Sequence, residues 1–278
     1  MIEVQPGLYR TGTAGQSPVV LLHSSQSNGG QWRALLNAFA PHFDCLVVDL
    51  LGYGKAPAVS MAEPHLFRFR DELPRIMNAI QALNWQQPVT LIGHSYGGAL
   101  ALKLAVEKPI DVRSLVVFEP VAFHLLEANE AARLEIESIS SQMVNKDAKA
   151  ATAAFVDYWN QPGYFAALPE KIQQAMTLQA GKVQCDFAAL MGEEYDLRDC
   201  ASIRQPTLLL QGQYTQNSAR TVAHKLEVAL PAVISRTLPC GHMGPITHAE
   251  AVNVEILEFL AAIYGLEAQP PTATDVRG

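Results

Sequence analysis

Ser95 is the residue whose surroundings point most directly to chemistry. It is the central residue of Gly-His-Ser-Tyr-Gly at 93–97, which follows an apolar run at 89–93 and precedes an Ala- and Leu-rich stretch. A serine at such a strand-to-helix turn is held in a strained conformation that exposes its oxygen, and the flanking glycines prevent collisions. The helix that follows directs backbone N–H groups at an oxyanion forming beside the serine. The pattern predicts that Ser95 is a nucleophile, and the alternative is a serine that only caps a helix.

Three further motifs share the order and spacing found in the α/β-hydrolase family, which the chain resembles over nearly all of its length. Leu-Leu-His-Ser-Ser at 21–25 corresponds to the His-Gly loop that follows the family's third strand. Asp-Leu-Leu-Gly-Tyr-Gly at 49–54 corresponds to its Asp-x-x-Gly-x-Gly stretch, and Cys-Gly-His-Met at 240–243 to the Gly-His after its last strand. With serine as the nucleophile, the resemblance implies an acyl-enzyme. A serine at this position excludes the dehalogenases and epoxide hydrolases of the family, which need a carboxylate nucleophile.

His242 is the candidate general base, because the resemblance places it in a glycine-flanked loop at the sheet edge next to Ser95. Histidine titrates near neutral pH, so it can take a proton from the serine and return it to the leaving group. His23 and His94 flank the same site at strand ends, where a structural hydrogen-bonding role is expected. His248 is expected to lie at the approach to the last helix, as a surface or packing residue.

The expected acid of the triad is displaced in this sequence. Residues 212–217 read Gly-Gln-Tyr-Thr-Gln-Asn, so Thr215 stands where many relatives carry a carboxylate. Glu119 ends the apolar run at 114–119, and some branches of the family, including certain haloalkane dehalogenases, carry their acid there. A carboxylate closing an apolar strand is costly without a partner, so Glu119 is predicted to orient His242. The alternatives are a solvated strand-end glutamate and a Ser–His pair without an acid.

The resemblance assigns the oxyanion hole to the backbone N–H groups of Tyr96 and Ser25. Ser24 stands where the family usually has glycine, so residues 24–28 could instead form a simple polar turn. Asp49 is expected to hold its own loop with its side chain, as turns of the Asp-x-x-Gly type commonly do.

Apolar strand-like runs alternate with helical stretches, which predicts an α/β fold with a mostly parallel central sheet flanked by helices. Pro74 favours the first turn of one of the helices. The expected strands are residues 19–22, 45–50, 89–93, 114–119, 206–212 and 233–238, with one or two edge strands in 3–12, and the clearest helices span 73–83, 96–107 and 252–263.

The alternation is interrupted once, and this defines the expected domains. Residues 1–120 and 205–266 are predicted to form the hydrolase core, and 121–204 a helical cap inserted after the strand ending at Glu119. Residues 267–278 are expected to be a flexible tail. The large apolar side chains of the cap either line a substrate pocket or form the cap's own core; they are Phe155, Tyr158, Trp159, Tyr164, Phe165, Met143 and Met191.

Composition narrows the classes of partner. The 278 residues are 49% hydrophobic and 17% charged with a net charge of −7, which fits a buried core and argues against nucleic acid as the main partner. No apolar run approaches the roughly 20 residues of a membrane span. The four cysteines lie far apart, so neither a disulfide framework nor a zinc site is expected. We expect no cofactor and no metal. The first ten residues lack the pattern of a secretory signal, and the expected location is cytoplasmic.

The function predicted is that of a serine hydrolase cleaving a small carboxylic ester or a related acyl compound through a Ser95–His242–Glu119 triad. The expected partner is a small-molecule acyl substrate, and a homodimer is left open. Other bonds that the same triad cleaves in relatives are C–C bonds, lactones, thioesters and N-terminal prolyl peptides. A non-catalytic ligand-binding protein on the same scaffold is the alternative from another functional class.

Overall fold

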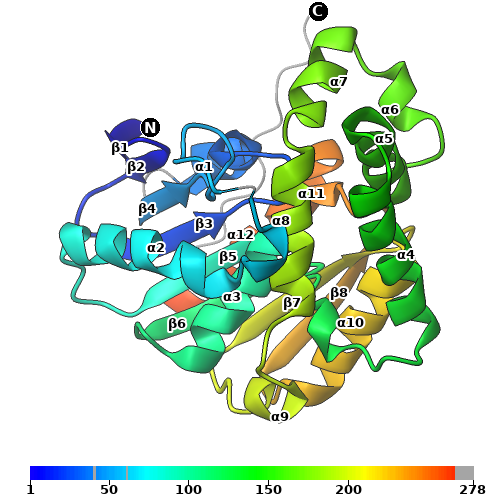
Figure 1. The fold of residues 1–278 in the computed structure, drawn as a ribbon. Coiled ribbons are helices and arrows are strands. Elements are labelled where there is room, and N and C mark those ends of the chain that lie inside the picture. Colours follow the sequence, from blue (N-terminus) through cyan, green and yellow to red (C-terminus); the bar gives the residue numbers. More distant parts are fainter. Residues whose placement is uncertain (40–41, 61, 267–278) are drawn as a thin grey trace, which may run out of the picture.

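The computed structural model describes residues 1–39, 42–60 and 62–266. Its eight strands form one sheet in the order β1-β2-β4-β3-β5-β6-β7-β8 (Figure 1). In the part of the sheet from β4 through β3, β5, β6 and β7 to β8, neighbouring strands are parallel. At the other edge, β2 pairs antiparallel with both β1 and β4. The fold class predicted from the sequence is therefore confirmed. The strands are β1 (Ile2–Gln5), β2 (Leu8–Gly12), β3 (Ser17–Leu22), β4 (Phe43–Val48), β5 (Val89–His94), β6 (Val112–Phe118), β7 (Thr207–Gly212) and β8 (Val233–Leu238).

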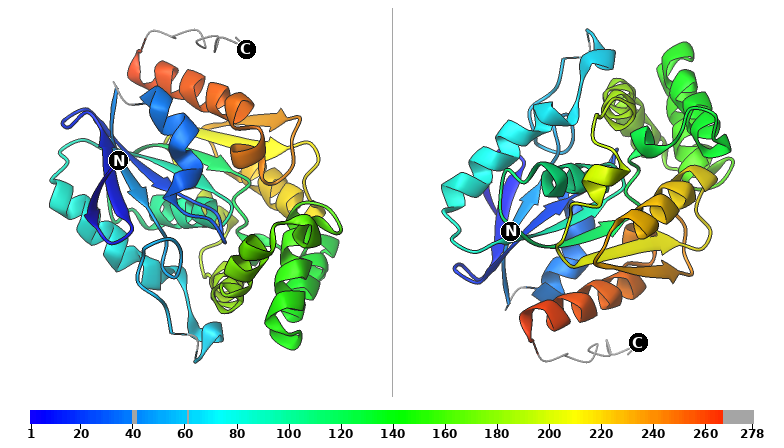
Figure 2. Two further views of the ribbon diagram at one scale, coloured as in Figure 1. Left: turned by 90° about the horizontal axis from the view of Figure 1, so that it is seen from above. Right: turned by 90° about the horizontal axis from the view of Figure 1, so that it is seen from below.

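Helices cover both faces of the sheet, which explains why its central strands are apolar without alternation. Val20 and Leu22 of β3 face a cluster completed by α2 (Phe69–Leu83), α3 (Tyr96–Glu107) and α10 (Asn217–Ala229). Their neighbours Val19 and Leu21 face the opposite cluster, completed by α1 (Arg33–Phe39) and α12 (Ala249–Tyr264). Figure 2 shows α1 and α12 together on one side of the sheet.

The predicted strands and helices are present, with differences at their ends. The strand expected at 45–50 ends at Val48 rather than at residue 50, and a turn follows at residues 51–52. The helix expected at 73–83 begins at Phe69, so Pro74 lies inside it and the prediction of a first-turn proline is wrong. The side chain of Asp71 accepts a hydrogen bond from the Arg68 N–H at 2.8 Å, which supports a start one turn earlier.

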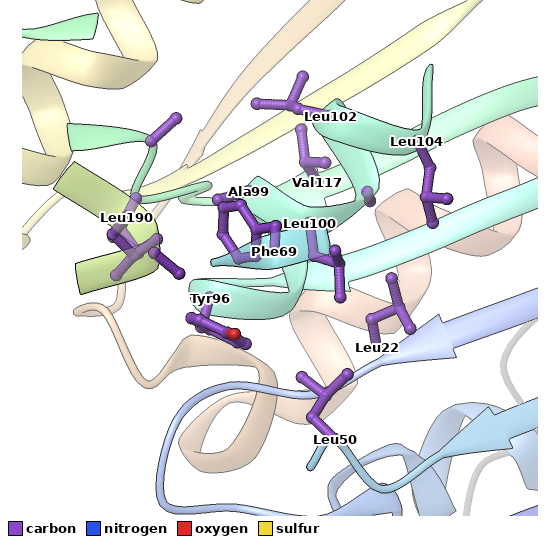
Figure 3. Close-up of a cluster of buried hydrophobic side chains, with 14 of the residues drawn as sticks. Leu22, Leu50, Phe69, Tyr96, Ala99, Leu100, Leu102, Leu104, Val117 and Leu190 are labelled. Carbon is purple, nitrogen blue, oxygen red and sulfur yellow. The ribbon is translucent and has the colours of Figure 1, made fainter. Parts of the chain in front are cut away.

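Between β6 and β7 the described chain contains helices and no strand. The longer helices are α4 (Ala131–Asn145), α5 (Ala148–Trp159), α7 (Glu170–Thr177) and α8 (Ala180–Met191), and the shorter ones are α6 (Tyr164–Ala167) and α9 (Leu197–Cys200). Leu190 of α8 packs into the same cluster as Leu22 and Tyr96 (Figure 3), so this helix is anchored on the core. The division into a core and a cap stays a prediction, and the expected tail at 267–278 lies outside the described residues.

Short helices complete the connections: the 3-10 helices η1 (Gly29–Trp32), η2 (Pro64–Leu66) and η3 (Phe123–Leu125), and the one-turn helix α11 (Gly244–Thr247). None of the helices in the described part of the chain has the length and apolar character needed to cross a bilayer.

Candidate active site

Ser95 stands at a sharp turn between β5 and α3. Its backbone adopts φ 56° and ψ −118°, a conformation that side-chain-bearing residues rarely adopt. The turn is tight enough that a Cβ on Gly93 would lie 2.4 Å from the carbonyl oxygen of Gly97, and one on Gly97 would lie 2.4 Å from that of Leu22. The Ser95 N–H donates to the Phe118 carbonyl at 3.0 Å, which ties the turn to β6. The two glycines of the motif are thus required by close packing.

A line of two hydrogen bonds joins Ser95, His242 and Glu119. The Nε2 atom of His242 lies 2.9 Å from Ser95 Oγ, and its Nδ1 atom lies 2.6 Å from Glu119 Oε2. All three side chains are buried, with 6%, 2% and 0% exposure of Ser95, His242 and Glu119. Because a carboxylate only accepts, Nδ1 carries the proton toward Glu119 and Nε2 is free to accept the serine proton. This arrangement fits nucleophilic catalysis with an oriented base.

Glu119 is held as a buried carboxylate by three donors. Its Oε1 accepts from the Gly212 N–H at 2.6 Å, and its Oε2 accepts from Thr215 Oγ1 at 2.6 Å as well as from His242. The backbone of Glu119 has φ +42°, so the chain leaves β6 in a turn that directs this side chain beneath the histidine. Thr215 thus donates to the acid from the position where many relatives carry it.

His23 and His94 have structural partners. Nε2 of His23 accepts from the Leu50 N–H at 2.9 Å, and Nδ1 donates to the Ser24 carbonyl at 2.7 Å. His94 Nε2 donates to the carbonyl of His242 at 2.9 Å. Burial lowers the pKa of His23 to about 4 and that of His94 well below its usual value. Both rings are therefore neutral supports of the site, which agrees with the role expected from the sequence.

The loop that carries Ser25 is held from two directions. Ser24 N and Oγ both donate to the Gln31 side chain at 3.2 Å. The Ser25 hydroxyl donates to Asp186 of α8 at 2.6 Å, and Gln26, with φ +54°, donates to the Met176 carbonyl of α7 at 3.0 Å. Tyr96 is the first residue of α3. The N–H groups of Tyr96 and Ser25 stay the predicted oxyanion donors.

Asp49 holds its own loop, as the sequence indicated. Its Oδ1 accepts from the Gly29 N–H at 2.7 Å and its Oδ2 from the Lys55 N–H at 2.9 Å. The carboxylate therefore ties together the two loops that follow β3 and β4.

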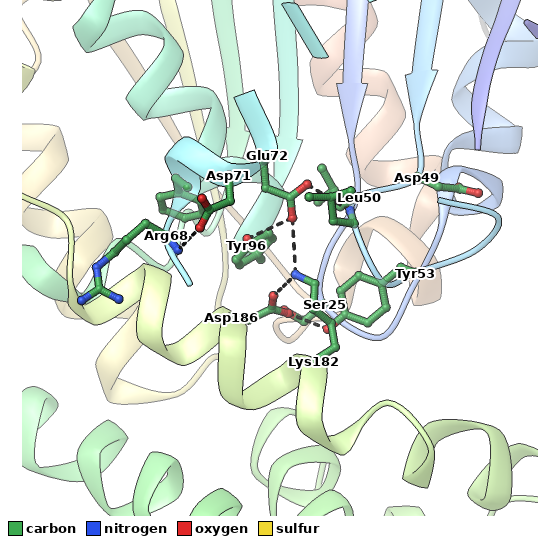
Figure 4. A network of polar contacts seen from close by, with 12 residues as sticks. Ser25, Asp49, Leu50, Tyr53, Arg68, Asp71, Glu72, Tyr96, Lys182 and Asp186 are labelled. Carbon is green, nitrogen blue, oxygen red and sulfur yellow. Dashed lines mark hydrogen bonds and ion pairs between the residues drawn. The ribbon is translucent and has the colours of Figure 1, made fainter. Parts of the chain in front are cut away.

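A buried charged cluster beside the Ser25 loop was not predicted (Figure 4). Lys182 is 1% exposed and pairs with Asp186, and its Nζ also lies 3.3 Å from Glu72 Oε1. Asp186 Oδ2 also accepts from the Tyr53 hydroxyl at 2.5 Å. Burial raises the pKa of Glu72. Burial alone would lower the pKa of Lys182, but the carboxylates of Asp186 and Glu72 outweigh this effect and raise the pKa. The spacing of four residues between Lys182 and Asp186 on a helix was the available signal.

Trp159 stacks on the ring of the candidate base. Its ring lies 3.8 Å from the His242 ring between centroids, at an interplanar angle of 27°. The sequence left each aromatic residue of this region between a pocket and a local core. The structure places Phe155, Trp159 and Tyr164 on cavity walls, whereas Phe165 is buried.

Two cavities meet at Ser95. The outer one has a volume of about 220 Å³ and is lined mainly by apolar side chains of α5, α6, α7 and α11. The inner one has a volume of about 10 Å³ and is lined mainly by side chains of η3, α5 and α8. Across the described ranges, no group of three or more His, Cys, Asp and Glu side chains is placed to bind a metal ion.

Comparison with known proteins agrees with this architecture. A family model described as "alpha/beta hydrolase fold" matches residues 17–249. A pimeloyl-[acyl-carrier protein] methyl ester esterase of Yersinia enterocolitica is 25% identical, over 88% of this chain and 93% of that protein. The 2-hydroxy-6-oxo-6-(2'-aminophenyl)hexa-2,4-dienoic acid hydrolase of Metapseudomonas resinovorans is 26% identical, over 88% and 84%.

Solved structures share the fold. The enol-lactonase of Burkholderia xenovorans superposes with a TM-score of 0.74 at 16% identity, covering 91% of this chain and 95% of that one. Some matches are more local; with one protein of Drosophila melanogaster the similarity spans 38% of this chain and 31% of the other.

Proposed function

The chain belongs to the α/β-hydrolase fold family, and on this basis we propose that it is a serine hydrolase of small, uncharged carboxylic esters. The observation that carries the proposal is the unbroken line of hydrogen bonds from Glu119 through His242 to Ser95. Relatives that match most of the chain include methyl ester esterases, which is in keeping with an ester substrate.

The proposed mechanism follows from the hydrogen bonds that join Ser95, His242 and Glu119. Ser95 Oγ attacks the ester carbonyl while His242 Nε2 takes its proton, and Glu119 stabilises the imidazolium that forms. The N–H groups of Tyr96 and Ser25 would donate to the oxyanion. His242 then gives its proton to the departing alkoxide, which leaves an acyl group on Ser95. A water molecule, deprotonated by His242, hydrolyses this intermediate and restores the serine.

The charges around the cavities favour an uncharged substrate. Among the described residues, no lysine or arginine lines either cavity, and the charged group that lines the inner one is the carboxylate of Asp186. An anionic substrate would lose its hydration without gaining a cationic partner. The Metapseudomonas relative acts, by its name, on an acid, so a neutral ester fits this site better than such a substrate.

The experiment that tests the proposal is covalent labelling with methanesulfonyl fluoride, a small reagent that sulfonylates activated serines. We expect Ser95 to be modified, as seen by peptide mass spectrometry, with loss of p-nitrophenyl acetate hydrolysis. The Ser95→Ala variant should fold normally and show neither reaction. Absence of labelling in the intact protein would instead support a non-catalytic ligand-binding protein.

A further inference from the structure

The two cavities that meet at Ser95 differ greatly in size. The inner cavity, of about 10 Å³, is bounded by Ser95, Phe123, Phe187, Leu190 and Asp186, among others. On the scale used for internal cavities, this is about the space for one water-sized group. It therefore accepts a substituent no larger than a methyl group.

The walls of the inner cavity are firmly packed. The Phe123 ring is nearly parallel to the Trp159 ring, with 6.4 Å between centroids and an angle of 11°, and to the Phe187 ring, at 6.5 Å and 17°. Phe123 and Leu190 are 1% and 4% exposed. Displacing side chains that are packed in this way costs free energy, so the inner cavity does not enlarge readily to admit a larger group.

The outer cavity is large enough for a ring. At about 220 Å³ it exceeds the roughly 150 Å³ of an engineered apolar cavity known to bind benzene. Phe155, Trp159 and Tyr164 give it aromatic walls, and Ile172 and Met176 of α7 add aliphatic surface. An aromatic or branched apolar group is the natural occupant of this cavity.

The position of His242 indicates which half of the ester lies in which cavity. It lines the outer cavity and is not among the residues that line the inner one. The leaving oxygen must come within hydrogen-bond reach of His242 Nε2 to receive its proton. The alcohol half of the ester therefore lies in the outer cavity, and the acyl half points into the inner one.

We propose that the protein is an acetylesterase selective for acetyl esters of apolar, ring-sized alcohols. The proposal rests on the serine hydrolase function proposed above and specifies its substrate. In the first step the bond from Ser95 Oγ to the acetyl carbon forms and the bond to the alcohol oxygen breaks, and His242 protonates that oxygen. In the second, water adds to the acetyl carbon and acetate leaves while Ser95 regains its proton.

A pair of isomeric esters tests the assignment of the two halves. Benzyl acetate places a methyl group on the acyl side and a ring on the alcohol side, whereas methyl phenylacetate reverses them. We expect kcat/KM for benzyl acetate to exceed that for methyl phenylacetate by about 100-fold or more, since misplacing several carbons costs at least as much as one methylene. Equal values, or the reverse order, would overturn the proposal.

A chain-length series tests the size of the inner cavity. With p-nitrophenyl esters, kcat/KM should fall by about tenfold or more from acetate to butyrate. Leu190→Ala, which enlarges the inner cavity, should raise the butyrate-to-acetate ratio by about tenfold or more. Val183→Ala is the smaller truncation of the same wall and should act in the same direction if Leu190→Ala fails to fold. Leu168→Ala, in the outer cavity, is the matched control and should leave the ratio unchanged.

Failure of this proposal is distinguishable from failure of the proposed function. A protein that is sulfonylated at Ser95 but prefers butyrate, or whose ratio is unmoved by both inner-cavity variants, is a serine hydrolase with another acyl specificity. A protein whose Ser95 is not sulfonylated is not a serine hydrolase, and the substrate assignment then falls with the function.

Discussion

Glu119→Gln is the substitution that most directly tests the displaced acid. The change keeps the shape of the side chain but replaces one acceptor oxygen with an NH₂ group that only donates. Oε1 of Glu119 faces the fixed N–H of Gly212 at 2.6 Å, whereas Oε2 faces the rotatable hydroxyl of Thr215 and the ring of His242. The amide oxygen is therefore expected at the Gly212 side, and the NH₂ group at the histidine.

The consequence is a change of tautomer. With an NH₂ group facing Nδ1, the neutral His242 ring must accept there and carry its proton on Nε2, where it can no longer accept the proton of Ser95. The corresponding Asp→Asn change of the triad acid in trypsin lowers kcat by about 10⁴-fold, which corresponds to about 5.5 kcal/mol of transition-state stabilisation. We expect a loss of this order in kcat for p-nitrophenyl acetate.

Thr215 provides the controls for this prediction. Thr215→Val removes one of the three donors to Glu119 and should lower kcat far less than Glu119→Gln. Adding Thr215→Asp to Glu119→Gln should restore part of the activity, because position 215 lies one hydrogen bond from the oxygen that His242 contacts. A Glu119→Gln enzyme with near-normal kcat would refute the reasoning whatever the result of the rescue.

Three further predictions concern other parts of the structure. His242→Ala should lower kcat nearly as much as Ser95→Ala, and the double variant should be little worse than either, because triad residues act as a unit; multiplicative losses in p-nitrophenyl acetate kinetics would show separate roles. Burial lowers the pKa of His23 and of His124 from 6.5 to about 4, so the folded state binds fewer protons than the unfolded chain over this range. In urea unfolding, the stabilisation from these histidines should therefore be present above pH 6.5 and be lost as the pH falls toward 4. The free energy of unfolding should decrease by up to about 1.4 kcal/mol per pH unit for each histidine; a free energy of unfolding that does not change with pH would contradict this. Lys182→Met should lower the unfolding free energy by about 3–5 kcal/mol, because it leaves buried carboxylates without their cation; an unchanged urea midpoint would contradict it.

The fold and the candidate triad could be predicted from the sequence because both depend on local sequence patterns. The turn at Ser95 needs glycines on either side, and close packing of Gly93 and Gly97 shows why. The absence of a carboxylate at 212–217 and the presence of one at the end of an apolar strand directed attention to Glu119. Each of these signals is contained in a short stretch of consecutive residues, so it can be recognised without knowing which helices pack together.

The features missed by the sequence depend on packing between distant segments. Lys182 and Asp186 are recognisable as a pair on one helix, but the sequence does not show that they lie against Glu72 and Tyr53, more than a hundred residues earlier. From the sequence, Trp159 was one of several aromatic residues that could either line a pocket or form a local core. The structure distinguishes it from the others because α5 places its ring against the ring of His242. The volumes of the two cavities likewise result from side chains on several helices.

The helices between β6 and β7 complete a site that the sheet alone leaves unfinished. The sheet and its loops place Ser95, Glu119 and His242, the three residues on which the proposed acyl transfer depends. From the helical segment, Trp159 covers the histidine and Asp186 holds the Ser25 hydroxyl. Relatives of similar fold are named for methyl esters, for a dienoic acid and for an enol-lactone, so the fold does not determine the substrate. We therefore expect substrate choice to depend on how α5 and α8 pack above Ser95, and substitutions there should change the preferred ester while the proposed triad continues to act.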